Sequence, residues 1–163
     1  MKPLAVISAV AVLWAAPLGA SWAQDKPLKD AIAGAWAIVA LTDEYDTGKK
    51  NNPWGAGLKG RIMFDGAGQF SQIIIGEKQE SMKSPDPRRP DALAVAFFGS
   101  YAVNEGDKTI VMKLERGSNS SRDGSEQKLT VKSSTGDTLV LVGSPRKDQH
   151  GTFSPIFELR RAK

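Results

Sequence analysis

Three acidic residues, Asp43, Glu44 and Asp46, stand close together just before Gly48. Paired carboxylates can act as general acid and general base, or they can bind calcium. The spacing of this cluster does not match that of a calcium-binding loop. We therefore expect a solvated loop here, with no metal site and no catalytic carboxylate.

Two further patterns could support nucleophilic catalysis, and neither has the geometry that this chemistry requires. His150 is the single histidine, with Ser144 and Asp148 near it, but closeness in sequence does not create a serine–histidine–acid triad. Ser125 and Lys128 match an S-x-x-K string, which works only when the two residues are one helical turn apart. Here the string begins a predicted strand, so the two side chains point to opposite faces. We predict no catalytic residue.

The residue types that the chain lacks exclude several classes of site. There is no cysteine, which excludes disulfides, zinc–cysteine sites and a thiol nucleophile. A single histidine excludes a multi-histidine metal site within one chain. The 22 basic and 18 acidic residues give a net charge of +4, and the basic residues are scattered, whereas nucleic-acid-binding proteins concentrate them on one face. We predict no metal, no cofactor and no nucleic-acid partner.

Residues 1–23 have the pattern of a signal peptide. Lys2 is followed by an almost wholly apolar run from Pro3 to Pro17, and the segment 21–23 places small residues where a signal peptidase reads them. We expect cleavage after Ala23 and export to the periplasm or the medium; an uncleaved anchor is the alternative. No second long apolar run follows, so we predict no membrane span in the mature chain.

The rest of the chain has the pattern of short strands separated by turns. Runs rich in Val, Ile, Phe, Thr and Leu alternate with glycine-containing turns, which is typical of an all-β protein. Residues 24–33 contain one predicted helical turn, and residues 76–92 form a polar, proline-rich connection. The eight predicted strands are 35–43, 58–65, 68–75, 97–104, 108–116, 126–133, 138–143 and 153–161.

Eight antiparallel strands in sequence would leave two exposed sheet edges, and closing the sheet removes both. The sequence therefore predicts an eight-stranded up-and-down antiparallel barrel over residues 34–163, with an open two-sheet sandwich as the alternative. The longer connections are 44–57, 76–96, 117–125 and 144–152, and strand parity places all four at one end. This end is the predicted mouth of a cup, because the other connections are tight turns.

Several motifs carry a family resemblance. Gly34-Ala35-Trp36 opens the first strand, the segment 58–71 places Asp-Gly-Ala-Gly between two extended runs, and 96–103 has an aromatic-Gly-x-Tyr strand. Together with a closing strand at 152–160, this set resembles the bacterial lipocalin-like domain family. The resemblance implies a calycin-type eight-stranded barrel and says little about chemistry. Unlike true lipocalins, this chain has no disulfide pair, and it carries the proline-rich insert.

The predicted barrel has a consequence for its closed end. In an even-stranded up-and-down barrel the last strand ends beside the start of the first, so Trp36 should lie near Arg160 or Arg161. An arginine over an indole gains cation–π attraction, and its stem covers the ring. We predict that Gly34, Trp36 and these arginines close the barrel. The alternative is that Trp36 is ordinary core and that both arginines are solvated.

The predicted cup has a largely apolar lining, which suggests a small hydrophobic or amphipathic ligand. On the first strand, alternation with Trp36 places Ile38 and Ala40 inside. Trp54 would act as a lid, and arginines at the rim could bind a carboxylate through paired hydrogen bonds. The predicted ligand-binding residues are Trp54, Phe64, Phe70, Tyr101, Met112 and Arg116. The polar rim candidates are Tyr45, Arg61, Gln72, Tyr101 and Arg116.

Three functions remain open from the sequence. The first is a binding protein for a small hydrophobic molecule. The second is a cofactor-free isomerase or cyclase on the same barrel, using Tyr101 with a rim acid or Arg116, since a fold does not fix a function. The third is a structural or interaction protein with a solid core. The sequence leaves the oligomeric state open.

Overall fold

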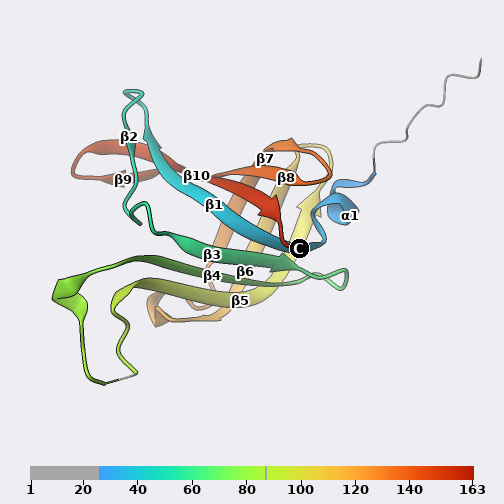
Figure 1. Cartoon of the computed structure of the whole chain (residues 1–163). Helices are drawn as coiled ribbons and strands as arrows, with labels where there is room; N and C mark the ends of the chain where they lie inside the picture. The colour runs from blue at the N-terminus through green and yellow to red at the C-terminus, as the bar shows by residue number, and fades with distance from the viewer. Residues whose placement is uncertain (1–25, 87) are drawn as a thin grey trace, which may run out of the picture.

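The computed structural model describes residues 26–86 and 88–163 (Figure 1). The predicted signal peptide, residues 1–23, lies outside the described residues. Two single turns of 3₁₀ helix are η1 (Glu80–Met82) and η2 (Ser120–Arg122). The other described elements are the short helix α1 (Leu28–Ile32) and the strands β1 (Gly34–Tyr45), β2 (Lys50–Asn51), β3 (Lys59–Phe64), β4 (Gln69–Lys78), β5 (Ala92–Asn104), β6 (Thr109–Gly117), β7 (Glu126–Ser134), β8 (Thr138–Gly143), β9 (Arg146–Asp148) and β10 (Gly151–Arg161).

The long strands form a closed barrel. β1, β3, β4, β5, β6, β7, β8 and β10 pair with their neighbours in this order, and β10 returns to pair with β1 from Trp36–Arg161 to Tyr45–Phe153. Every pairing is antiparallel. This confirms the predicted eight-stranded up-and-down barrel and excludes the two-sheet sandwich. The short strands β2 and β9, which the sequence did not predict, extend β1 and β10 at one end.

Alternation of apolar and polar residues places one side of each strand inside the barrel. In β7, Leu129 and Val131 are buried and the intervening Lys128, Thr130 and Lys132 are exposed. β5 begins at Ala92, five residues before the predicted start, because Ala92 and Ala94 pair with the end of β4. The connection between these strands is therefore shorter than expected.

The packed core fills the half of the barrel near α1. Trp36, Ile62, Leu129 and Leu139 are each fully buried there. Phe64 meets Tyr101 edge to face at 5.0 Å between ring centroids. The Tyr101 hydroxyl donates a hydrogen bond to the backbone carbonyl of Asp65, in the tight turn between β3 and β4, and so joins β5 to this turn.

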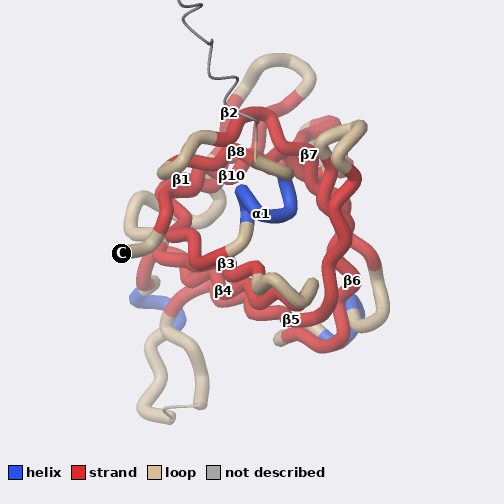
Figure 2. Tube along the Cα trace, turned by 90° about the vertical axis from the view of Figure 1, so that its right-hand side faces the viewer, coloured by secondary structure: helices blue, strands red, loops and turns tan. Residues whose placement is uncertain are grey.

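The helix α1 lies over the closed end of the barrel, inside the ring of strands in Figure 2. Its first backbone N–H groups, those of Leu28 and Lys29, donate to the carboxylate of Glu105 at 2.8 and 3.0 Å. The indole Nε1 of Trp36 donates to the carbonyl of Ile32 at 2.7 Å. Because free N–H groups at a helix start attract negative charge, Glu105 fixes the helix start to the β5–β6 turn.

Arg161, and not Arg160, covers the indole. Its guanidinium carbon lies 4.1 Å from the centroid of the Trp36 ring, and its Nη1 and Nη2 donate to the carbonyls of Ala33 and Ala31. Arg160 is exposed on the outer wall. Gly34 has φ of +120°, and a Cβ there would come within 2.8 Å of Arg161 Nη1, so a glycine is required both by the backbone and by this close approach.

One expectation about β1 is wrong. The register against β10 shifts between Ile38 and Ala40, which is a β-bulge, and Val39 is 53% exposed. Beyond the bulge the inward positions move by one residue, so Leu41 is buried and Ala40 pairs with the exposed Glu158 on the outside. Ala40 therefore does not line the interior.

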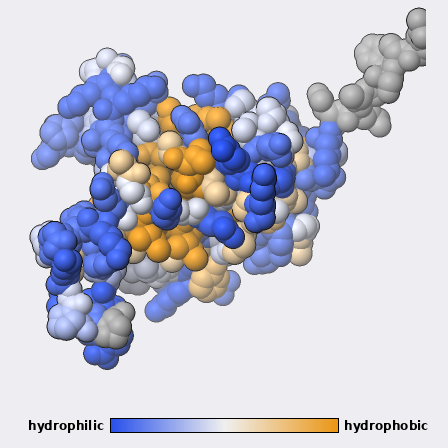
Figure 3. Space-filling model, in the orientation of Figure 1, coloured by the Kyte–Doolittle hydropathy of each residue, from blue (hydrophilic) through white to orange (hydrophobic). Residues whose placement is uncertain are grey.

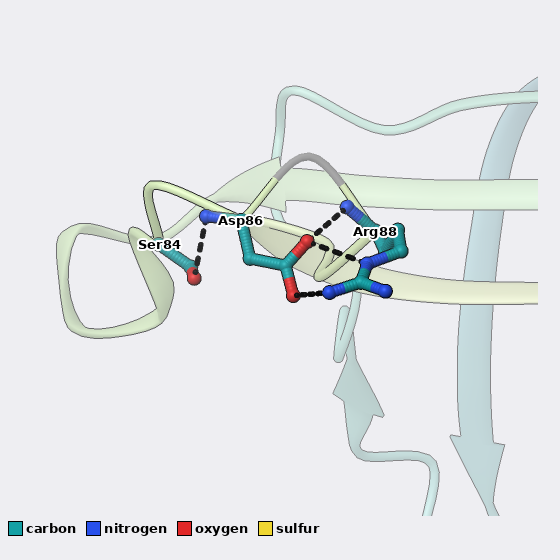
Figure 4. A network of polar contacts seen from close by, with 3 residues as sticks. All are labelled: Ser84, Asp86 and Arg88. Carbon is teal, nitrogen blue, oxygen red and sulfur yellow. Dashed lines mark hydrogen bonds and ion pairs between the residues drawn. The ribbon is translucent and has the colours of Figure 1, made fainter.

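The β4–β5 connection is organised by its own polar contacts (Figure 4). The carboxylate of Asp86 accepts hydrogen bonds from Arg88 Nε at 2.9 Å and Nη2 at 3.1 Å, and Ser84 Oγ accepts from the Asp86 backbone N–H. Arg88 is largely exposed. These contacts order the loop without joining the barrel interior. Within residues 26–86 and 88–163, no helix has the length and apolar character to cross a membrane.

Candidate ligand-binding cavity

A cavity of about 260 Å³ lies at the end of the barrel opposite α1, where β2 and β9 project in Figure 1. A wider, open hollow lies beside α1 at the other end of the barrel, where it is lined by residues that include Pro27, Ser134 and Arg161. The volume of the first cavity is slightly below the range of about 300–1,000 Å³ that holds drug-sized ligands, so that cavity suits a smaller molecule. Its apolar wall is formed mainly by Leu41, Trp54, Ile74, Val95, Phe97 and Phe157, and its polar groups are Asp43, Gln72, Arg122, Gln127 and Arg146.

Strand pairing places the wall residues. Gln72 pairs with Phe97 and Ile74 pairs with Val95 across the β4–β5 ladder, and residues opposite each other share a face of the sheet. On β1 the bulge after Ile38 brings Leu41 and Asp43 to the inner face. Without this bulge Asp43 would point outward, as the sequence analysis expected for a solvated loop.

Arg122 enters the cavity from the β6–β7 connection. Asn119 caps η2 by accepting the backbone N–H of Ser121 at 3.1 Å. The guanidinium carbon of Arg122 then lies 4.8 Å from the centroid of the Phe97 ring, and its Nη2 donates to Gln127 Oε1 at 3.1 Å. Burial lowers the pKa of Arg122, and the nearby cation of Arg146 lowers it further. Arginine nevertheless keeps its charge in proteins.

Gln72 is the buried polar group whose bonding is incomplete. Its side chain is 2% exposed, and its Oε1 has no hydrogen-bond partner within the part of the chain that the structure describes. A buried acceptor without a partner destabilises a protein by roughly 1–3 kcal/mol. Gln72 is also one of the residues that line the cavity.

The rim of the cavity also carries a carboxyl group, that of Asp43. Burial raises the pKa of the Asp43 carboxyl, Arg146 opposes this shift, and Asp148 adds to it. Nearby, the Tyr45 hydroxyl donates to Asp148 Oδ2 at 2.8 Å. This hydrogen bond raises the pKa of Tyr45 and lowers that of Asp148. It also ties the end of β1 to β9, which fixes the shape of the rim.

Trp54 is the predicted ligand-binding residue that lines the cavity. It is half-buried, and its carbonyl accepts the backbone N–H of Glu77 at 2.8 Å. The side-chain amide of Asn52 donates to the carbonyl of Gly55 at 3.1 Å and steadies the same turn. Trp54 is therefore held at the rim beside β4, which suits the predicted lid.

The other predicted ligand-binding residues lie elsewhere. Phe64, Phe70, Tyr101 and Met112 are buried but do not line the cavity, and the first three lie in the packed half. Arg116 is exposed on the outer wall, where its Nη1 lies 3.4 Å from Asp123 Oδ2. The two residues named for an isomerase or cyclase, Tyr101 and Arg116, are thus not brought together in this cavity. A role for these five residues in ligand binding stays a prediction.

The remaining candidate groups do not converge either. Glu44 forms an ion pair with Lys50 at 3.3 Å on the outside of the barrel. The Ser144 hydroxyl donates to the carbonyl of Lys128 at 3.3 Å, and the carboxylate of Asp148 accepts the backbone N–H of His150. Among the described residues, no group of three or more His, Cys, Asp or Glu is placed to hold a metal ion.

The sequence analysis missed Arg122, Gln127 and Arg146 and treated Asp43 as solvated. Gln127 shares the inward phase of Leu129 and Val131 in β7, so alternation alone could have placed it inside. Arg122 carries no such signal, because its position depends on the fold of the η2 turn. Gln72, a polar rim candidate, does line the cavity.

Several solved structures are similar to this chain. Among solved structures, a redesigned β-barrel matches with a TM-score of 0.44 at 12% identity, covering 84% of this chain and 96% of that one. A complex of bovine odorant binding protein with a selenium-containing odorant matches with a TM-score of 0.43 at 15% identity, covering 85% and 74%. Apocrustacyanin C1 matches with a TM-score of 0.44 at 19% identity, covering 86% and 66%.

Structural similarities this distant do not indicate what the chain binds. No curated protein matches the chain. The model of the lipocalin-like domain family, however, matches residues 33–154, from the end of α1 into β10. The match includes the Gly34–Trp36 opening, the strands from β1 to β9 and most of the cavity wall, and the chain therefore belongs to the lipocalin-like domain family.

Proposed function

We propose that this protein is exported and binds a small hydrophobic or amphipathic molecule in the open cup of its barrel. The observation that carries the proposal is the cavity of about 260 Å³ at the mouth, at the end of the barrel opposite α1, Trp36 and Arg161. A barrel of this size can be filled completely by side chains. Here the packed core stops short of the mouth and leaves apolar wall exposed to the cavity.

The wall favours an apolar ligand for a simple energetic reason. Burying apolar surface contributes roughly 25 cal/mol per Å², and a cavity that is already formed needs little rearrangement of the wall. Leu41, Ile74, Val95 and Phe157 provide such surface on four strands, and Trp54 covers part of the rim. The polar groups at the mouth make an amphipathic ligand as suitable as a purely apolar one.

Titration with 1-octanol, followed by calorimetry and by native mass spectrometry, tests the proposal. We expect saturable binding of one molecule per chain. The variant Val95→Trp fills the cavity from its wall and should abolish binding. The matched control is Ala94→Trp on the same strand, because Ala94 is exposed and does not line the cavity. Absence of saturable binding, or equal binding by Val95→Trp, would refute a ligand-binding cup.

Export is tested separately. Expression of the full chain in a bacterium, followed by mass spectrometry of the periplasmic and medium fractions, should show a mature chain that begins at Gln24. The control is a chain with Ala23→Leu, which removes a small residue from the predicted cleavage site and should block processing. Retention of residues 1–23 by the native sequence in the cytoplasmic fraction would contradict export.

A further inference from the structure

We propose that the cavity selects a small carboxylate whose chain also carries a hydrogen-bond donor, with Arg122 binding the carboxylate and Gln72 Oε1 accepting from the donor. This inference rests on the proposed ligand-binding function and goes beyond it by assigning the chemistry of the ligand's polar end. It stands on two polar residues that neighbour Phe97: Arg122 lies over the Phe97 ring, and Gln72 pairs with Phe97 across the β4–β5 ladder.

Arg122 is held in place but not neutralised. Phe97 supports one face of the guanidinium, and Gln127 accepts one of its N–H groups. Among the described residues, Phe97 and Gln127 are the side chains that its guanidinium stacks on or bonds to, and no carboxylate lies within ion-pair distance of it. A guanidinium presents a planar set of donors that matches a carboxylate bidentately. The site is therefore oriented for an anion that the chain itself does not supply.

The charges around the cavity also favour an anionic ligand. Arg146 is the second cation at the cavity wall, and Asp43 is the carboxylate that lines it. With Asp43 ionised, these three groups leave one net positive charge, which suits a monoanion. Any protonation of Asp43 makes the cavity more positive. A cationic head group would meet two arginines and only one carboxylate, so the field at the mouth opposes it.

Gln72 supplies the second, independent observation. It lies directly opposite Phe97 in the β4–β5 ladder, its side chain is almost fully buried, and its Oε1 lacks a partner among the described residues. An ionised carboxylate has only acceptors and cannot satisfy this oxygen. A ligand that satisfies this oxygen therefore needs a hydroxyl or N–H group in addition to its carboxylate. The apolar remainder lies against Leu41, Ile74 and Phe157.

Calorimetric titrations with probes of equal chain length test the assignment. The probes are 1-octanol, octanoate, octylamine, octyl phosphate and 3-hydroxyoctanoate, at one pH and one ionic strength. Octanoate should bind at least about tenfold more tightly than 1-octanol, since hydrogen bonds to charged groups contribute this much, and octylamine should bind more weakly than 1-octanol. The hydroxyl of 3-hydroxyoctanoate should improve on octanoate by a further factor of about three to ten.

Single substitutions test which residues cause these differences in affinity. Arg122→Gln should reduce octanoate affinity to about that of 1-octanol, and it should change the affinity for 1-octanol much less than that for octanoate. The matched control, Arg160→Gln, makes the same charge change on the exposed outer wall and should change neither affinity. Gln72→Leu should remove the advantage of 3-hydroxyoctanoate over octanoate, so that the two acids bind the variant with equal affinity. Circular dichroism confirms that each variant is folded.

The results of these titrations test separate parts of the proposal. If 1-octanol binds and octanoate binds no better, the carboxylate assignment is overturned while the ligand-binding function stands. If neither binds, the proposed function itself fails. Tighter binding of octyl phosphate than of octanoate overturns the choice of a carboxylate, and equal binding of the hydroxylated and plain acids overturns the role of Gln72. The comparison of octanoate with octylamine uses the unmodified protein. It can therefore refute the assignment even if a variant does not fold.

Discussion

The guanidinium carbon of Arg161 lies 4.1 Å from the centroid of the Trp36 ring, across the seam where β10 pairs with β1. The same side chain donates to the carbonyls of Gly136, Ala33 and Ala31, each at 2.9 Å. One residue therefore joins the last strand, the β7–β8 turn, the end of α1 and the indole. This arrangement closes the barrel and leaves the opposite end free for the cavity.

Replacing Arg161 by lysine should destabilise the protein although the charge is kept. An ammonium group cannot supply three directed hydrogen bonds to carbonyls that lie around a planar guanidinium, nor can it stack in the same way on the indole. We expect the free energy of unfolding in urea to fall by about 1.5–3 kcal/mol. Arg160→Lys, on the exposed outer wall, should change it by less than about 0.5 kcal/mol. Equal effects of the two substitutions would contradict the closure role of Arg161.

Replacing Trp36 by alanine should have a larger effect. The indole is fully buried, and its Nε1 donates to the carbonyl of Ile32. Removing it leaves a cavity and an unpaired carbonyl, for which we expect a loss of about 3–5 kcal/mol in the free energy of unfolding. The affinity of folded protein for 1-octanol should not change, because Trp36 does not line the mouth cavity. A loss below about 0.5 kcal/mol would remove Trp36 from the core.

The barrel could be predicted because its signals are local. Strands such as β7 alternate with a period of two, tight turns carry glycine, and the parity of eight strands brings the end of β10 to the start of β1. The contact between Trp36 and one of two arginines follows from that parity. The choice of Arg161 over Arg160 depends on which side chain points inward at the last pair, and boundaries inferred from sequence are not accurate enough to decide this.

The cavity was less predictable because it depends on two irregularities. The bulge after Ile38 arises from the pairing of β1 with β10, and nothing in the sequence of β1 marks it; yet it turns Asp43 inward. Arg122 belongs to a short turn whose cap is Asn119, and its direction follows from that turn rather than from a strand. Strand alternation could place Gln72 and Gln127 inside, but it could not show that an arginine would join them.

Replacing Gln72 by leucine should stabilise the free protein. The substitution removes a buried oxygen that has no partner among the described residues and keeps a side chain of similar size in the wall. We expect the free energy of unfolding to rise by about 1 kcal/mol. Gln127→Leu is the matched comparison, and it should destabilise by about 1–2 kcal/mol because Arg122 loses its acceptor. A destabilisation by Gln72→Leu would indicate that the amide is satisfied in solution.

The pH dependence of stability should report the contact between Tyr45 and Asp148. The hydrogen bond from the Tyr45 hydroxyl lowers the pKa of Asp148 from its ordinary 3.8. A group whose pKa is lower in the folded state stabilises that state above its unfolded pKa, and this contribution is lost as the pH falls through the folded pKa. Tyr45→Phe should therefore be less stable than the wild type near neutral pH.

The difference between the two proteins should shrink as the pH falls below about 3.8. Urea unfolding of both proteins at a series of pH values down to about 2 measures this difference. The variant Asp148→Asn serves as the control, since introducing Tyr45→Phe into it should produce a difference that does not depend on pH in this range. If the difference in stability between the wild type and Tyr45→Phe stays constant down to the lowest pH, Asp148 does not contribute to it.

Trp54 separates binding from stability more sharply than any other residue at the mouth. Its side chain is half-buried at the rim, and the turn that carries it is held mainly by backbone hydrogen bonds and by Asn52. Trp54→Ala should therefore leave the free energy of unfolding nearly unchanged, in contrast to Trp36→Ala. Because the indole covers part of the cavity, its removal should weaken binding of 1-octanol by several-fold and speed its release. Titration and stopped-flow release kinetics measure both quantities. Unaltered affinity and release would show that Trp54 does not act as a lid, whereas a large loss of stability would assign it to the core.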